Sequence, residues 1–174
     1  WVHMEIMEGS YGGRYGQDGM DAVDTLYANT RNNPIEDIES HLPLRVLKYE
    51  LREANSGHGK WRGGLGTVRL FEFLEDGAIS IEGDGHKYEP WGLDGGTDGS
   101  TAEINLIEKS NIKASLPSKI PYKKIPAGTR IQVVGPNGGG YGPKSERDPE
   151  LIKSDLENEF ITDIIAKEAY YTKF

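Results

Sequence analysis

The sequence predicts an α+β fold with a β-dominated sheet, mixed or antiparallel, that carries glycine-rich loops and is followed by two C-terminal helices. Apolar residues alternate in several short stretches before residue 135, glycine-rich segments separate these stretches, and helical spacing begins only after residue 148. The 174 residues suit one domain of ordinary size. We therefore expect a single region that is rich in strands and loops over residues 1–142 and helical over residues 148–174.

The first expected elements are a strand over residues 2–8 and a short helix that starts near residue 33. Apolar and polar residues alternate over 2–8 and lead into a glycine-rich bend, which is typical of a strand followed by a turn. Asn33 is a good N-cap, Pro34 fits the first helical position, and Pro43 ends the helix. The apolar residues of the first stretch are Val2, Met4 and Ile6.

Three strands come next, and an antiparallel meander is their simplest arrangement. Leu47, Tyr49 and Leu51 share one face of the first strand, as in a half-buried strand. An Asp-Gly pair before residue 78 is a hairpin-type turn signal between the second strand and the third. The three strands are expected at residues 44–52, 67–74 and 78–82.

The second half of the chain predicts two more strands and then two helices. The strands cover residues 103–107 and 129–134, with short extended pieces between them. Asp148 is an N-cap with Pro149 at the next position, which predicts the start of a helix. Thr162 is a second N-cap, and the apolar stripe of a terminal helix follows it.

Composition excludes several kinds of site and disfavours several kinds of partner. The chain has no cysteine, so disulfides, thiolate metal sites, iron–sulfur clusters and a cysteine nucleophile are excluded. A formal charge of -8 disfavours nucleic acid and anionic membranes. No apolar run approaches the roughly 20 residues of a membrane span, and the first residues lack the blocks of a secretory signal. We expect a cytoplasmic protein with neither a nucleic-acid nor a membrane partner.

The histidines give no indication of a metal site made wholly from this chain. They lie at positions 3, 41, 58 and 86, and no two of them have the spacing of metal ligands. Surface or capping roles are the simpler interpretation. The local signatures of a nucleophilic serine turn, a zinc-binding helix and a phosphate-binding lysine loop are also missing from the sequence.

The glycine-rich loop over residues 135–142 permits two interpretations. Consecutive glycines at Gly138, Gly139 and Gly140 could turn backbone N–H groups toward a phosphate. However, no lysine follows closely, and the next helix signal comes about six residues after the last glycine. The other interpretation is close backbone packing against another segment or subunit, with Tyr141 as the anchor.

The loops over residues 9–19 and 29–39 hold the richest set of polar side chains. Loops on a rigid scaffold often carry binding groups, so these side chains are the candidates for substrate binding or for a subunit junction. An internal salt bridge from Arg31 to a helix carboxylate such as Glu36 is an equally good explanation. The candidate residues are Arg14, Asp18, Asn29, Thr30 and Arg31.

Two tryptophans stand beside glycines in other loops, Trp61 before Gly63 and Trp91 before Gly92. Each indole could cover an apolar seam where two backbones come close, or it could stack on a ligand. Covering an apolar seam is the simpler explanation for both tryptophans.

Seven sequence blocks, read in order, span nearly the whole chain. They are Asp18-Gly19 with residues 29–34, then residues 43–52, 57–64, 90–96, 116–119, 136–142 and 147–150. Together these blocks closely resemble the hydantoinase B/oxoprolinase family. The resemblance is to the C-terminal portion of a B-type subunit several times longer than this chain, so we expect a piece of a longer polypeptide, a processed subunit or a separate small subunit.

The resemblance implies membership of an ATP-dependent assembly. A hydantoinase A-type subunit is implied to bind ATP with Mg and to phosphorylate a cyclic amide or a ketone enolate. The implied substrates are lactam-like rings such as N-methylhydantoin, 5-oxoproline and caprolactam, or ketones such as acetone and acetophenone. A divalent metal, Zn or Mn, is implied to lie outside this chain, in the N-terminal portion of the B-type subunit. No catalytic or metal-binding residue is therefore assigned here.

The expected function is that of a C-terminal part or small subunit of an ATP-dependent cyclic-amide hydrolase. It would help to form the active-site junction with the A-type subunit and the N-terminal portion of the B-type subunit, because a phosphorylated intermediate must be shielded from water. An ATP-dependent ketone carboxylase and a noncatalytic assembly module are the two alternatives. We expect the isolated chain to be inactive.

Overall fold

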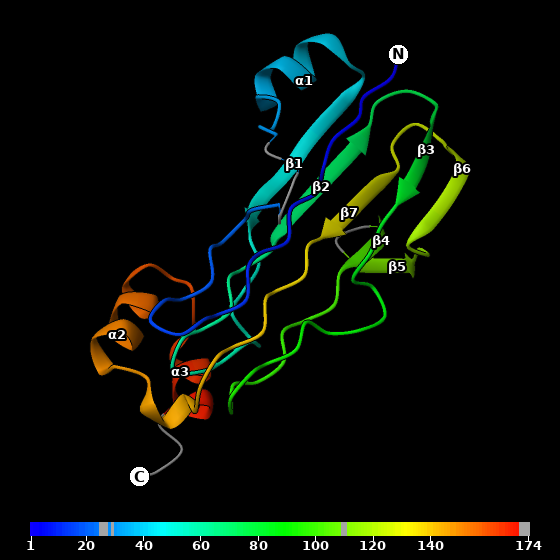
Figure 1. Ribbon diagram of the computed structural model, residues 1–174. Coiled ribbons are helices and arrows are strands. Elements are labelled where there is room, and N and C mark those ends of the chain that lie inside the picture. The colour runs from blue at the N-terminus through cyan, green and yellow to red at the C-terminus, as the bar shows by residue number, and fades with distance from the viewer. Residues whose placement is uncertain (25–27, 29, 109–110, 171–174) are drawn as a thin grey trace.

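The computed structural model describes residues 1–24, 28, 30–108 and 111–170. Its strands gather at one end, its two C-terminal helices lie at the other end, and long glycine-rich loops run between them (Figure 1). The predicted α+β class, with antiparallel strands and C-terminal helices, is confirmed.

A five-stranded antiparallel sheet forms the centre of the β-rich end. The strands are adjacent in the order β1-β2-β7-β4-β5. A separate two-stranded ribbon, β3 with β6, packs on the apolar face of this sheet together with α1. The elements are α1 (Ile35–His41), β1 (Leu44–Leu51), β2 (Thr67–Phe73), β3 (Gly77–Glu82), β4 (Glu103–Glu108), β5 (Asn111–Ser115), β6 (Lys119–Ile125) and β7 (Arg130–Val134). The buried residues of this first core are Ile38, Leu44, Phe73, Ile104, Ile125 and Ile131.

The expected three-strand meander is wrong in its third strand. β2 pairs with β1 on one side, but its other neighbour is β7, and β3 pairs with β6. Pairing with β7 places Ile131 directly opposite Phe71 and so extends the apolar face. Ile79 and Ile81 of β3 pack from the second layer against the first core. This position buries more apolar surface than a place at the edge of the five-stranded sheet would.

β1 has the predicted bounds but not the predicted face. Its register against β2 shifts between Val46 and Lys48, which indicates a β-bulge. The residues expected to be half-buried, Leu47, Tyr49 and Leu51, are 39%, 40% and 37% exposed, because the bulge changes the alternation on this edge strand.

Residues 2–8 belong to neither sheet, so the predicted first strand is wrong. The segment passes over β2 (Figure 1), and the Glu8 carbonyl accepts a hydrogen bond from the backbone N–H of the first residue of β2. The expected alternation of apolar and polar side chains is present, but the polar side chains face the sheet and the apolar ones face solvent. Val2 and Met4 are 92% and 87% exposed, whereas the intervening polar side chains contact the sheet.

The positions of the helices are confirmed, but the predicted cap of α1 is wrong. α1 begins at Ile35, its N-cap is Pro34 and not Asn33, no side chain caps it, and it ends before Pro43. α2 (Pro149–Glu157) starts at Asp148, whose side chain accepts the N–H of Glu150, and α3 (Asp163–Ala169) starts at Thr162, whose hydroxyl oxygen accepts the N–H of Ile165. In the described part of the chain, none of the helices has the length and apolar character needed to cross a bilayer. α2 and α3 bury a second core whose fully buried members are Ala54, Leu65, Ile152, Ile161 and Ala166.

Loops from four parts of the chain meet around Gly138, Gly139 and Gly140, which we call the glycine hub. The backbone N–H of Gly138 donates to Gly64 O, and that of Gly140 donates to Thr97 O, both at 2.9 Å. The carbonyl of Gly139 accepts from Gly13 N at 2.8 Å. A Cβ atom on any of the three hub glycines would lie within 3.0 Å of a backbone atom, namely of Tyr11, Trp91 and His58 respectively.

We predict that Gly138→Ala destabilises the folded protein by about 3 kcal/mol or more, because its Cβ would overlap the backbone of Tyr11. Urea unfolding would measure the change. Gly12→Ala is the matched control, since its Cβ would lie 3.4 Å from the Gly139 carbonyl oxygen, an ordinary contact. We expect the control to change the free energy of unfolding by about 1 kcal/mol or less. Equal effects of the two substitutions would contradict backbone packing as the reason for glycine.

Candidate functional site

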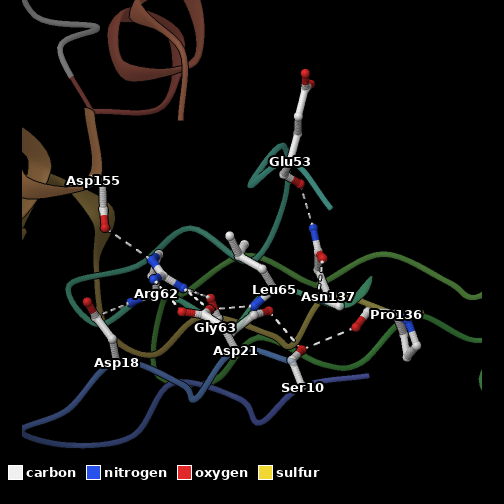
Figure 2. A network of polar contacts seen from close by, with 12 residues as sticks. Ser10, Asp18, Asp21, Glu53, Arg62, Gly63, Leu65, Pro136, Asn137 and Asp155 are labelled. Atoms are coloured by element: carbon white, nitrogen blue, oxygen red, sulfur yellow. Dashed lines mark hydrogen bonds and ion pairs between the residues drawn. The ribbon is translucent and has the colours of Figure 1, made fainter. Parts of the chain in front are cut away.

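A group of buried and partly buried charges lies where the glycine-rich loops meet the C-terminal helices (Figure 2). Three carboxylates surround two guanidinium groups, so the formal charge of the group is negative by one. We call this group the arginine–aspartate cluster. Its members are Asp18, Asp21, Arg62, Arg147 and Asp155.

Each arginine of the cluster makes one two-pronged ion pair and one link to Asp155. Arg62 donates from Nη1 and Nη2 to the two oxygens of Asp21, at 2.7 and 3.2 Å. Arg147 donates from Nη1 and Nη2 to the two oxygens of Asp18, both at 2.8 Å. Asp155 lies between them and accepts from Arg62 Nε at 3.2 Å and from Arg147 Nη2 at 2.7 Å. Two-pronged pairs of this kind fix geometry as well as charge.

Separate elements of the fold supply these side chains. Asp18 follows the exposed turn in which Arg14 and Gln17 form a two-residue backbone bridge. Arg62 stands in the glycine-rich segment that contacts the hub, and its own backbone N–H donates to Asp18 Oδ1 at 2.7 Å. Asp155 lies on the buried side of α2, and Arg147 immediately precedes the cap of that helix. The cluster therefore ties the loops to the C-terminal helices.

Every carboxylate oxygen of the cluster already accepts a hydrogen bond. Asp21 Oδ1 accepts a further one from Leu65 N at 2.8 Å, and Asp18 Oδ1 accepts from both Arg62 N and Arg147. A carboxylate acts as a general base or a metal ligand through a free lone pair near the reacting group. These three carboxylates are occupied by arginine, so the arrangement supports structure and not proton transfer.

The electrostatics of the cluster favour permanently charged arginines. Burial lowers the pKa of Arg147, but the hydrogen bonds and charge of Asp18 and the charge of Asp155 outweigh it, and the net pKa is raised. The pKa of Arg62 is also raised, because Asp21 and Asp155 outweigh the effect of burial. Arg62 lies over the Phe160 ring at 5.0 Å, which adds a cation–π contact.

His58 and Tyr170 form a neutral pair beside the cluster. The Tyr170 hydroxyl lies 3.3 Å from His58 Nδ1, and the two rings meet edge to face. Burial, and then the positive charge of Lys144, lowers the pKa of His58 to about 4. Burial raises the pKa of Tyr170 to about 12. A general base works best with a pKa near the working pH, so neither group is tuned for that role.

Of the five predicted site residues, the structure places one in a network of side-chain contacts. Asp18 joins the arginine–aspartate cluster, whereas Arg14 is exposed and donates to Gln17 Oε1 at 2.6 Å. Thr30 and Arg31 are exposed, and within the described residues Arg31 makes no ion pair with Glu36 or any other carboxylate. Asn29 lies outside the described residues.

The glycine loop does not fit a phosphate group. The N–H groups of Gly138, Gly140 and Tyr141 donate to backbone carbonyls of Gly64, Thr97 and Trp61. These donors therefore cannot converge on an anion without breaking the hub. Tyr141 forms bridges to two other loops, at Trp61 and Leu93, as the packing interpretation expects of an anchor.

The two tryptophans behave differently from each other. Trp61 is partly buried and pairs through its backbone with Tyr141. Trp91 is 80% exposed, so it covers no seam among the described residues. Its carbonyl nevertheless packs on Gly139, which fixes the position of its loop.

Local sequence patterns did not identify the most buried members of the site. Arg62, Arg147 and Asp155 were not predicted to carry chemistry, although Arg62 and Arg147 stand inside two of the seven sequence blocks. For Arg62 the available signal was a charged residue inside a glycine-rich block, where few neighbouring side chains in the sequence could pair with it. Among the residues that the structure places, His, Asp and Glu side chains nowhere gather in a group of three or more that could hold a metal ion.

We predict that Arg147→Met lowers the free energy of unfolding by about 3–5 kcal/mol, because the half-buried Asp18 loses its cation and the buried Asp155 keeps only its ion pair with Arg62. Urea unfolding measures this loss. Lys60→Met is the matched control, since it removes one positive charge from an exposed ion pair with Glu146. The control should cost less than about 1 kcal/mol. A small effect at Arg147 would show that the cluster does not stabilise the fold.

We predict that stability decreases as the pH falls from about 6.5 to about 4, with His58 as one cause. The unfolded chain protonates this group near pH 6.5, whereas the folded protein does so near pH 4. Between these values the unfolded state binds more protons, so acid favours unfolding. His58→Gln should flatten this part of the curve of thermal midpoint against pH, and His41→Gln at an exposed site should not. An unchanged slope in the His58 variant would contradict the prediction.

Comparison with known proteins agrees with the shared order of the seven sequence blocks. The family model described as hydantoinase B/oxoprolinase matches residues 1–144. A protein of Pseudomonas sp. (strain NS671), provisionally named as the B-type subunit of a D-/L-hydantoinase, is 61% identical over 163 residues, which are 93% of this chain and 28% of that protein.

Two solved structures share the fold. The crystal structure of ATP-dependent caprolactamase from Pseudomonas jessenii matches with a TM-score of 0.80 and 22% identity, over 93% of this chain and 29% of that one. The nucleotide-free structure of acetone carboxylase matches with a TM-score of 0.76 and 20% identity, over 93% of this chain and 26% of that one. This chain thus spans less than a third of the length of each of these proteins. Since the family model matches most of its residues, the chain belongs to the hydantoinase B/oxoprolinase family.

Proposed function

We propose that this chain is the C-terminal region of the B-type subunit of an ATP-dependent cyclic-amide hydrolase, and that it supports the active-site junction with an ATP-using A-type subunit. The observation that carries the proposal is the 61% identity to a protein named as the B-type component of a hydantoinase, which extends over 93% of this chain. Because the reaction needs ATP, the proposal places the assembly in the cytoplasm.

The internal chemistry of the chain supports a positioning role. The carboxylates of its arginine–aspartate cluster are held by arginines, and its partly buried His58 is held neutral at physiological pH by a pKa of about 4. Its loops are joined through backbone hydrogen bonds at the glycine hub. Such an arrangement gives a rigid wall, which is what an active-site junction requires of the part that excludes water.

ATP and Mg are assigned to the A-type subunit in this proposal. The amide groups of Gly138, Gly140 and Tyr141 donate to the carbonyls of Gly64, Thr97 and Trp61, which supports placing the nucleotide elsewhere. Any divalent metal, Zn or Mn, is likewise assigned to the N-terminal portion of the B-type subunit. The chain's own part in the reaction is to hold the junction in shape and to present loop side chains to it.

Arg14, Thr30 and Arg31 remain the proposed contacts at that junction, with Asn29 in the same loop. They are exposed, and their guanidinium and hydroxyl groups are available to a carbonyl oxygen or a carboxylate of a ring-opened product. Asp18 acts in this proposal as a positioning residue, because its two oxygens are taken by Arg147.

A ketone carboxylase is the second candidate, because acetone carboxylase shares the fold. That likeness, at 20% identity, extends to the fold alone, whereas the sequence likeness points to a hydantoinase component. A noncatalytic assembly module is the third candidate, and it predicts that the isolated chain binds its partner subunit but neither nucleotide nor substrate, which calorimetry of the isolated chain would test.

We predict that the complete B-type polypeptide, purified together with its A-type subunit, releases ADP only when a cyclic amide is present. The substrates to test are a hydantoin, 5-oxoproline and caprolactam, with ring opening followed by mass spectrometry. The comparison reaction contains acetone or acetophenone with bicarbonate. Turnover with the ketones alone would favour the carboxylase, and no turnover with either class would contradict the proposed function.

We further predict that Arg31→Ala lowers turnover of this assembly about tenfold, the loss expected for a hydrogen bond to a charged group. Steady-state kinetics with the best substrate measure it. Arg45→Ala removes an exposed arginine from β1 and is the matched control, expected to leave turnover unchanged. If Arg31→Ala also leaves turnover and assembly unchanged, the loop over residues 29–39 is no part of the site.

A further inference from the structure

The N-terminal segment over residues 2–8 is oriented against the usual rule of burial. Its polar side chains point to the protein: His3 and Glu5 have side chains only 12% and 6% exposed. Its apolar side chains point outward, with Val2 92% and Met4 87% exposed. In a chain surrounded by water, the opposite arrangement would be the stable one.

Strong polar contacts hold the segment in this orientation. Arg69 of β2 donates from Nη1 to Glu5 Oε1 at 2.6 Å and from Nη2 to Glu8 Oε2 at 2.7 Å. Tyr49 stacks on the same guanidinium at 4.0 Å, and its hydroxyl accepts from Nη2 at 2.8 Å. The pKa of Arg69 is raised, because the charges of Glu5 and Glu8 outweigh the effect of burial. The inner side of the segment is thus fixed, and turning it over would leave Arg69 buried without its carboxylates.

The backbone of residues 2–7, unlike the Glu8 carbonyl, has no backbone partner in the part of the chain that the structure describes. Among the described residues, no backbone hydrogen bond involves residues 2–7, although the segment is extended beside a sheet. An extended chain with free N–H and C=O groups and alternating apolar side chains is a template for another strand.

From this geometry we infer that residues 2–7 form a β-strand with another strand, which covers Val2, Met4 and Ile6. We commit to one occupant: a segment of the B-type polypeptide outside these 174 residues. The inference rests on the proposed function only in taking this chain as part of that longer polypeptide.

The choice of occupant follows from two observations. The relatives described above are more than three times as long as this chain, so a B-type polypeptide of their length supplies ample further chain. An apolar strand edge is an aggregation hazard whenever it is bare, so its cover must be permanent. A covalently linked segment is always present, whereas a separate subunit or a second copy leaves the edge bare until it binds.

Hydrogen exchange on the complete B-type polypeptide, without its A-type subunit, tests the inference. We expect the alternate amides of residues 2–7 that face the added strand to exchange as slowly as those of β7, which is paired on both sides. Met4→Asp should speed exchange of these amides at least about tenfold, because a carboxylate would be buried in the new interface. Ile164→Asp, at a 67% exposed position of α3, is the matched control and should leave these amides protected.

Three results would overturn the inference. Fast exchange in the unaltered polypeptide, with and without the A-type subunit, would mean that no strand pairs there. Protection that appears only when the A-type subunit is added would make the occupant that subunit. Protection that rises with protein concentration would make it a second copy. If Met4→Asp fails to fold, the unaltered polypeptide still decides among these outcomes. Protected amides in a protein that opens no cyclic amide would contradict the proposed function and leave this inference standing.

Discussion

Backbone-to-backbone packing at the glycine hub is the constraint on which the rest of the structure depends. Each hub glycine has a carbonyl of another loop in the place where a side chain would start, at Tyr11, Trp91 and His58. Hydrogen bonds from Gly138 and Gly140 add further links, to Gly64 and Thr97. The loops therefore have one register relative to one another, although few apolar side chains lie between them. This is why a chain with 23 glycines holds its long loops in fixed positions.

The fixed register sets up the arginine–aspartate cluster. Gly13, which bonds to the hub, leads into the turn that carries Asp18, and the segment whose Gly64 accepts from the hub carries Arg62. The loop that contains the hub continues to Arg147 and then to α2. Three segments that meet at one backbone contact thus present opposite charges to one another, and the C-terminal helices are held by ion pairs in addition to their own small core.

Much of the fold could be predicted from local patterns, and the failures have physical causes. Caps and prolines predicted the starts of α2 and α3, because those signals act within a few residues. Alternation predicted β2, β4 and β7, but it could not say that β3 crosses to a second layer, since pairing depends on distant partners. It also could not tell which side of residues 2–8 is buried, because that depends on Arg69 in another strand.

The site was predictable only in part. Asp18 was found because it stands in a polar loop, but its partners come from positions 44 and 129 residues away. The family was evident from the order of the blocks, whereas the reason for the glycines in them is visible only when the loops are brought together.

The glycine hub also affects the rigidity of the molecule. The first core and the second core lie on opposite sides of a layer built from main chain. Side chains can absorb a small displacement by changing rotamer, but main chain packed against main chain has no rotamers to change. A displacement of the C-terminal helices would therefore be transmitted through this rigid layer to the strands.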